Sequence, residues 1–184
     1  MIPQQLLTRI EALLGQQEQV LIAIDGHCAA GKTTLAGALK GRYDCNILPI
    51  DDFFLRPEQR TPERLRETGG NVDYERFREA VLAPLCAGRA FSYAPYNCGT
   101  QRLGQPIPVP RKRLNIVEGT YSLHPYFGDV YDLRILLTVP EEVQQQRILQ
   151  RPAFLHRRFF EEWIPMERQY FQGFDIASAC DLIL

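Results

Sequence analysis

The stretch Gly26-His27-Cys28-Ala29-Ala30-Gly31-Lys32-Thr33 fits the pattern G-x-x-x-x-G-K-[ST], which is typical of loops that wrap around phosphate groups. The six residues before it, 20–25, form an apolar and β-branched run that predicts a buried strand. Residues 33–40 carry apolar side chains at helical spacing. A strand, a glycine loop and a helix in this order favour a phosphate site on an α/β sheet over a chance glycine turn.

Each residue type in the loop suits the binding of a triphosphate. Backbone N–H groups can surround phosphate oxygens only where no Cβ blocks their approach, and Gly26 and Gly31 meet this condition. We expect Lys32 to reach the β and γ phosphates and the hydroxyl of Thr33 to be a ligand of Mg²⁺. The predicted ATP-binding residues of the loop are Gly26, His27, Cys28, Ala29, Ala30, Gly31, Lys32, Thr33 and Thr34.

Length and composition limit the possible functions. The 184 residues suit one domain, 1–184, and include 23% charged and 45% hydrophobic residues. The formal net charge of −1 gives no reason to expect a nucleic-acid or membrane partner, and no apolar run approaches the roughly 18 residues of a membrane span. The five cysteines lack metal-binding spacing and no secretory signal opens the chain, so we expect a reduced, cytoplasmic setting.

The remaining segments predict an α/β fold, with a five-stranded parallel sheet between two layers of helices. An amphipathic helix is expected over 6–14, ending at Gly15, and further helices begin near 73 and 140. An aromatic-rich helix is expected over 154–174, where core packing explains the aromatic residues, although one face could border a base. The five strands are expected at 20–25, 46–50, 114–117, 133–139 and 181–184.

Two acidic residues directly follow predicted strands. In open parallel sheets, ligands bind beyond the carboxyl ends of the strands, so Asp51 and Glu118 should face the same crevice as the phosphate loop. Asp51 is our candidate general base, and Glu118 is placed to hold Mg²⁺ directly or through water. The alternative is that Asp51 and Asp52 only cap a loop.

Three other regions could complete a site. Residues 56–71 contain several prolines and glycines and predict a mobile loop, followed by Asp73 as a plausible helix N-cap. A small hairpin outside the main sheet is expected at about 90–110. A basic segment at about 147–158 resembles a lid; Arg147 and Arg151 lie four residues apart and are therefore expected on one helix face, and Arg157 and Arg158 follow. A solvated helix face is the alternative explanation of these arginines.

Together, five segments resemble the uridine kinase and phosphoribulokinase family of P-loop kinases, in order over most of the chain, and uridine kinase-like proteins most closely. The family resemblance implies a P-loop kinase α/β/α sandwich and transfer of the ATP γ-phosphoryl group, with Mg²⁺, to the 5′-hydroxyl of uridine or cytidine. The five segments are 26–34, Asp51-Asp52-Phe53-Phe54, Asn71-Val72-Asp73, 93–97 and Val117-Glu118-Gly119.

The resemblance also implies roles for individual residues. Asp51 matches the catalytic base, while Lys32, Thr33 and Glu118 match phosphate and metal residues. Asp73 matches a carboxylate that binds the ribose hydroxyls. The predicted residues of the hairpin and lid are Tyr96, which matches an aromatic contact to the pyrimidine, and Arg147 and Arg151, which fall where lid and substrate arginines occur.

The sequence departs from the family pattern on the acceptor side. Residues 97–101 lack the histidine that reads the base in the nucleoside kinases, and Gln101 is the nearest hydrogen-bonding substitute. Asp52 stands where those enzymes usually carry a small neutral residue, and the segment after Arg151 is short for a lid. A kinase of another small alcohol, such as pantothenate or a sugar, therefore remains open.

Other functional classes compete with a kinase. A nucleotide-dependent regulatory switch remains possible, although it does not need a base such as Asp51, and no N-K-x-D motif is present. The charge balance disfavours a nucleic-acid kinase or helicase, and a homo-oligomer stays open. The helix N-terminus should lower the pKa of the Cys28 thiol, so modification of Cys28 should block ATP binding.

Overall fold

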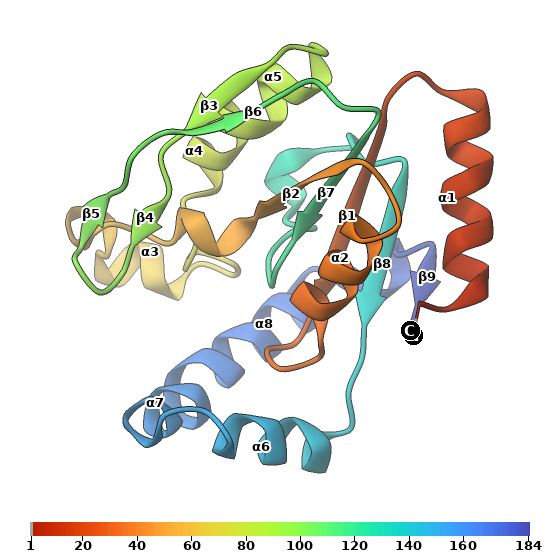
Figure 1. Ribbon diagram of the computed structural model, residues 1–184. Coiled ribbons are helices and arrows are strands. Elements are labelled where there is room, and N and C mark those ends of the chain that lie inside the picture. Colours follow the sequence, from red (N-terminus) through yellow and green to blue (C-terminus); the bar gives the residue numbers. More distant parts are fainter. Residues whose placement is uncertain (1) are drawn as a thin grey trace.

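The computed structural model describes residues 2–184, and a five-stranded sheet lies at its centre (Figure 1). The strand order is β2-β7-β1-β8-β9, and every neighbouring pair is parallel. The predicted five-stranded parallel sheet with helices on both faces is confirmed. The strands are β1 (Val20–Gly26), β2 (Cys45–Pro49), β7 (Leu114–Glu118), β8 (Leu133–Leu137) and β9 (Leu182–Ile183).

Helices cover both faces of the sheet, because successive side chains of a strand point to opposite sides and both sides of β1 are apolar. Ile22 and Ile24 pack against α1 (Gln4–Gln16) and α2 (Lys32–Lys40). Leu21 and Ala23 lie in a second cluster with Phe77 and Tyr170 from the helices on the other face. The sheet is therefore the middle of three layers.

The other helices follow β2 and β8. Two of them contain a π-helical turn, Arg78–Leu82 (η3) between α4 and α5, and Phe159–Trp163 (η5) between α7 and α8. Within residues 2–184, no helix is long and apolar enough to cross a membrane. The remaining α-helices are α3 (Pro62–Arg66), α4 (Tyr74–Phe77), α5 (Ala83–Cys86), α6 (Glu141–Leu149), α7 (Ala153–Arg158) and α8 (Ile164–Gly173).

Strand ends differ from the predictions by one or two residues, and two helical regions differ more clearly. The first helix continues through Gly15 to Gln16, because the N–H of Gln17 still bonds to the carbonyl of Leu13 at 2.9 Å. The segment 56–71, which we predicted as a loop, contains a 3₁₀ turn (η2, Pro57–Gln59) and α3. Arg64 of α3 orders the residues between α3 and α4, since its guanidinium donates to the carbonyl of Gly70 at 3.2 Å.

The hairpin predicted over 90–110 forms outside the main sheet as two short antiparallel ladders (Figure 1). The first ladder pairs β3 (Phe91–Tyr93) with β6 (Ile107–Val109). The second pairs β4 (Tyr96–Asn97) with β5 (Arg102–Leu103). In the turn between β4 and β5, the side-chain oxygen of Asn97 accepts from the N–H groups of Gly99 and Thr100. The tip of the hairpin is thus fixed by local bonds.

Candidate active site

A cavity of about 910 Å³ lies at the carboxyl ends of β1, β2 and β7, where parallel sheets bind their ligands. The phosphate loop, Asp51 and Glu118 line it on the side of the sheet. Arg147, Arg151 and α8 close it on the other side. Its size falls within the range of pockets that hold small-molecule ligands.

The phosphate loop has the backbone geometry that its glycines permit. Gly26 has φ of 147°, and a Cβ there would lie 2.3 Å from the carbonyl oxygen of Leu137. Gly31, with φ of 103°, precedes the first turn of α2. The ammonium of Lys32 donates to the carbonyl oxygens of Gly26 at 2.7 Å and His27 at 2.8 Å. The positive charge of Lys32 is therefore held at the loop.

Thr33 and Glu118, the two predicted metal residues, lie together although 85 positions separate them. The Thr33 hydroxyl donates to Oε1 of Glu118 at 3.1 Å. Burial and the nearby charge of Asp51 raise the pKa of Glu118. No group of three or more His, Cys, Asp or Glu residues within 2–184 gathers as a metal cluster. The Thr33 and Glu118 pair still fits Mg²⁺, because this ion usually takes few protein ligands and keeps waters and phosphate oxygens.

Asp51 lies directly after β2, in a 3₁₀ turn (η1, Ile50–Phe53), and faces the cavity. Its side chain reaches solvent there, but protein surrounds it on the other sides, and this desolvation raises its pKa. Lys32 lowers the pKa of Asp51, whereas the charges of Asp52 and Glu167 raise it further. A raised pKa makes a carboxylate a stronger base at neutral pH while it remains ionised.

The lid arginines divide into two pairs. Arg147 and Arg151 line the cavity, and Arg147 donates to the carbonyl oxygen of Ala29 in the phosphate loop at 2.8 Å. The expectation that they share a helix face is wrong, because α6 ends at Leu149, before Arg151. Arg157 and Arg158 instead pair with glutamates one turn along the helix and do not line the cavity. For this second pair, the alternative of a solvated helix face fits the structure.

No protein-family model matches the sequence. Three solved structures are similar over most of the chain, and the first is a possible uridine kinase from Bacillus stearothermophilus, with a TM-score of 0.70 and 17% identity over 98% of this chain and 99% of that one. The second is a putative fructose transport system kinase from Silicibacter sp. TM1040, with a TM-score of 0.65 and 21% identity over 98% of this chain and 97% of that one. The third is D-glycerate 3-kinase from Cryptococcus neoformans, with a TM-score of 0.57 and 12% identity over 94% of this chain and 84% of that one.

The chain has the fold of the P-loop kinases. At these identities the likeness is one of fold alone.

The residues predicted to read a nucleoside do not line the cavity. The carboxylate of Asp73 caps α4 by accepting from the N–H of Arg76 at 3.2 Å, as the N-cap interpretation predicted, and it also accepts from Gln59 at 2.9 Å. Tyr96 is buried in the second hairpin ladder. Gln101 is exposed in the turn at the tip of the hairpin. None of the three predicted substrate residues, Asp73, Tyr96 and Gln101, is among the described residues of the cavity wall.

Asp25 is a structural anchor of the site that our sequence analysis missed. It is fully buried and accepts three hydrogen bonds, from the N–H of Gly26 at 2.7 Å, the N–H of Leu123 at 2.9 Å and the hydroxyl of Tyr170 at 2.8 Å. Burial outweighs these bonds and raises its pKa to about 6. The sequence could have indicated Asp25, because it is a carboxylate near the end of an otherwise apolar strand.

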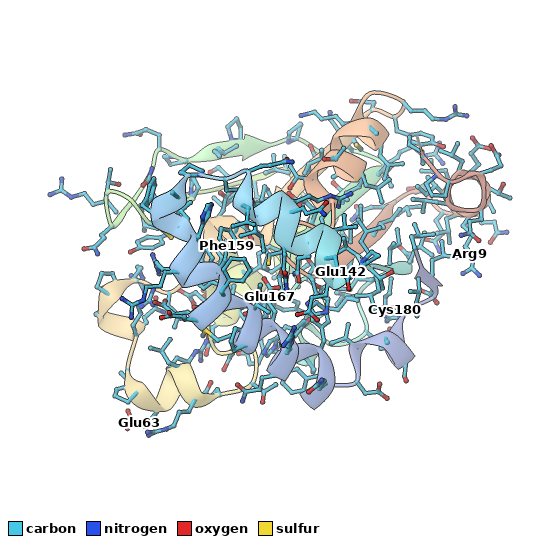
Figure 2. All side chains as sticks on the ribbon, turned by 90° about the horizontal axis from the view of Figure 1, so that it is seen from below. Arg9, Glu63, Glu142, Phe159, Glu167 and Cys180 are labelled. Carbon is cyan, nitrogen blue, oxygen red and sulfur yellow. The ribbon has the colours of Figure 1, made fainter. Side chains whose placement is uncertain are left out.

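Glu167 was also missed, and it reaches the phosphate loop from α8. Figure 2 labels it with Phe159 on the C-terminal helices, over the middle of the molecule. It is 5% exposed, and its carboxylate accepts from the N–H of Cys28 at 2.9 Å. The spacing of Ile164, Glu167 and Tyr170 puts a glutamate on the buried face of α8, which the sequence could have indicated.

The prediction that the pKa of the Cys28 thiol is lowered is wrong, because the pKa is raised. Burial and the neighbouring Glu167 raise the pKa of its thiol to about 12, and they outweigh Lys32, which lowers it. The side chain packs against a hydrophobic cluster of Ile148, Phe159 and Ile164. Cys28 is therefore a packing residue between the phosphate loop and the C-terminal helices, and its thiol is a poor nucleophile.

Proposed function

We propose that this protein is an ATP-dependent kinase that phosphorylates a hydroxyl group of a small molecule. One observation carries the proposal. Lys32, Thr33, Asp51 and Glu118 come from three separate segments, yet all four line one cavity beside the phosphate loop. Phosphoryl transfer requires a protein mainly to position its reactants and to neutralise charge. Lys32 supplies a cation, Thr33 and Glu118 supply two candidate ligands for one Mg²⁺, and Asp51 supplies a base.

In the proposed reaction, Asp51 accepts the proton of the acceptor hydroxyl as the acceptor oxygen bonds to the γ phosphorus. The bond between that phosphorus and the β–γ bridging oxygen breaks, and ADP leaves with the bridging oxygen. Lys32, Arg147 and Arg151 hold the phosphates by charge. Thr33 and Glu118 are the residues that would hold Mg²⁺, which when bound neutralises phosphate charge.

Two acceptor classes are supported by different observations. Uridine or cytidine is the acceptor that the sequence resemblance implies. A different small alcohol, such as a sugar or pantothenate, is favoured by the position of Asp73, Tyr96 and Gln101 outside the cavity wall. A regulatory switch that binds ATP without transferring phosphate would leave Asp51 without a chemical role.

The test is ATP consumption with Mg²⁺ across nucleosides, pantothenate and sugars, measured for the native protein and for Asp51→Asn. The variant should bind ATP normally but lose at least about a hundredfold in rate, because it lacks the general base. Asp44→Asn is the matched control, since Asp44 is exposed and pairs with Lys112 away from the cavity. Transfer that survives in Asp51→Asn would contradict the assigned base, and ATP binding without any transfer would favour the switch.

A further inference from the structure

Among the polar side chains that line the cavity without a part in the phosphate chemistry proposed above are Asn71, Tyr121 and Glu167. They come from the segment before α4, from the turn after β7 and from α8. They are 8%, 3% and 5% exposed. Polar groups this deeply buried nearly always have hydrogen-bond partners, so those that also border a cavity are suited to bind a polar ligand.

Tyr121 has an unusual backbone conformation, with φ of 80°, which a residue with a bulky side chain rarely adopts. The surrounding turn holds it there: the N–H of Leu123 donates to buried Asp25, the hydroxyl of Ser122 donates to the carbonyl of Gly119 at 2.7 Å, and the tyrosine ring packs on Tyr170. Tyr121 lies three positions after Glu118, and the turn holds it in this strained conformation. The strain indicates that the orientation of the Tyr121 side chain matters for function.

Asn71 is held beside the loop of Asp51. Its neighbour Val72 forms an antiparallel bridge with Phe54, and the N–H of Asp73 donates to the carbonyl of Phe53 at 2.7 Å. The side chains of Asn71 and Tyr121 line the same cavity. Together they present an amide group and a phenolic hydroxyl, which can donate to and accept from the hydroxyl groups of a ligand.

Glu167 determines which charge the ligand can carry. An ionised carboxylate only accepts hydrogen bonds, and the N–H of Cys28 uses part of this capacity, while Nδ1 of His27 lies 3.6 Å from Oε2 of Glu167. Asp51, Glu118 and Glu167 give the cavity wall three carboxylates, whereas its cations, Lys32, Arg147 and Arg151, are assigned above to the phosphates of ATP. An acceptor with a carboxylate or phosphate group would be repelled here, whereas hydroxyl groups would find both donors and acceptors.

We infer that Asn71, Tyr121 and Glu167 recognise the acceptor, and that the acceptor is a neutral polyol of the sugar type, bound through its hydroxyl groups. This inference rests on the proposed kinase function and names its substrate class. Recognition of this kind needs no base, which agrees with the placement of Tyr96 and Gln101 outside the cavity wall.

The experiment compares matched acceptors at saturating ATP and Mg²⁺: ribose, glycerol and glucose against the acids ribonate, glycerate and gluconate, with uridine alongside. We expect Asp51-dependent transfer to at least one neutral polyol, with kcat/KM at least about tenfold above that of its acid counterpart, as expected when a buried charge is opposed. Tyr121→Phe keeps the ring, and it should raise the KM of the acceptor about tenfold while the KM of ATP stays unchanged.

Tyr126→Phe is the matched control, because Tyr126 is 41% exposed and does not line the cavity. Glu167→Gln should reduce the discrimination against the acids, since it removes a negative charge. Preference for an acid, transfer only to uridine, or equal changes in the two KM values for Tyr121→Phe would overturn the inference. Asp51-dependent transfer in any of these cases would leave the kinase proposal standing, and its absence for every acceptor would end both.

Discussion

The phosphate side and the acceptor side of the cavity were predicted with different success. On the phosphate side, Lys32, Thr33, Asp51 and Glu118 lie where sequence analysis expected them to meet. On the acceptor side, Asp73 and Tyr96 serve capping and packing, and residues that no motif had marked line the cavity instead. The difference shows that the phosphate side depends on local backbone geometry, whereas the acceptor side depends on which distant segments pack together.

The largest effect should come from Gly119→Ala, which tests how closely the residues around Asp51 are packed on the phosphate side. Gly119 has φ of 133°, and an added Cβ would lie 2.4 Å from Cγ2 of Ile50 and 3.3 Å from Oδ1 of Asp51. Displacing the proposed base by about 1 Å should lower kcat by about a hundredfold. Gly128→Ala is the control, because Gly128 also has positive φ but open space around its Cα. Equal kcat values in the two variants would contradict this account.

A smaller effect should separate the two pairs of lid arginines. Arg151→Ala removes a cation from the cavity wall and should raise the KM of ATP about tenfold. Arg157→Ala should leave this KM unchanged, because the Arg157 side chain is 83% exposed and pairs only with Glu161. Steady-state kinetics with varied ATP distinguishes them. If both substitutions raise the KM alike, the second pair also belongs to the lid.

The pH dependence of kcat/KM should report the environment of Asp51 on the phosphate side. In the proposed reaction Asp51 can accept a proton only when ionised, so kcat/KM should fall as the pH drops through its raised pKa. Asp52 contributes to that rise, and Asp52→Asn should therefore lower the pKa of Asp51 and move the acid limb to lower pH. The asparagine oxygen can still accept from the hydroxyl of Tyr93. An acid limb that stays in place, as it should for Asp44→Asn, would show that another group controls it.

The smallest effect concerns Cys28. With a thiol pKa of about 12, roughly one molecule in ten thousand carries the Cys28 thiolate at about pH 8. Alkylation by iodoacetamide should therefore modify the exposed Cys86 and Cys98 before Cys28. Mass spectrometry of a time course measures the order. Early modification of Cys28 would mean that the contact between the phosphate loop and the C-terminal helices opens readily.

Much of the fold was predictable because its signals are local. The apolar run before Gly26, the glycine loop and the helix after it lie within about twenty residues, and each has one physical explanation. The ends of the other parallel strands then had to meet the same edge of the sheet, which placed Asp51 and Glu118. The hairpin was expected, but its split into two ladders depends on pairing that its prolines do not specify.

The sequence alone determined the parallel sheet and the chemistry of the phosphate loop, since strand periodicity and glycine spacing act over a few residues. Tertiary structure decided the rest. Whether Asp73 caps a helix or faces a ligand, whether the Cys28 thiol is acidic, and whether Tyr121 and Glu167 border the cavity depend on burial and on neighbours far away in the chain. Hydrogen bonding and desolvation act through space, so they become visible only when the segments have packed.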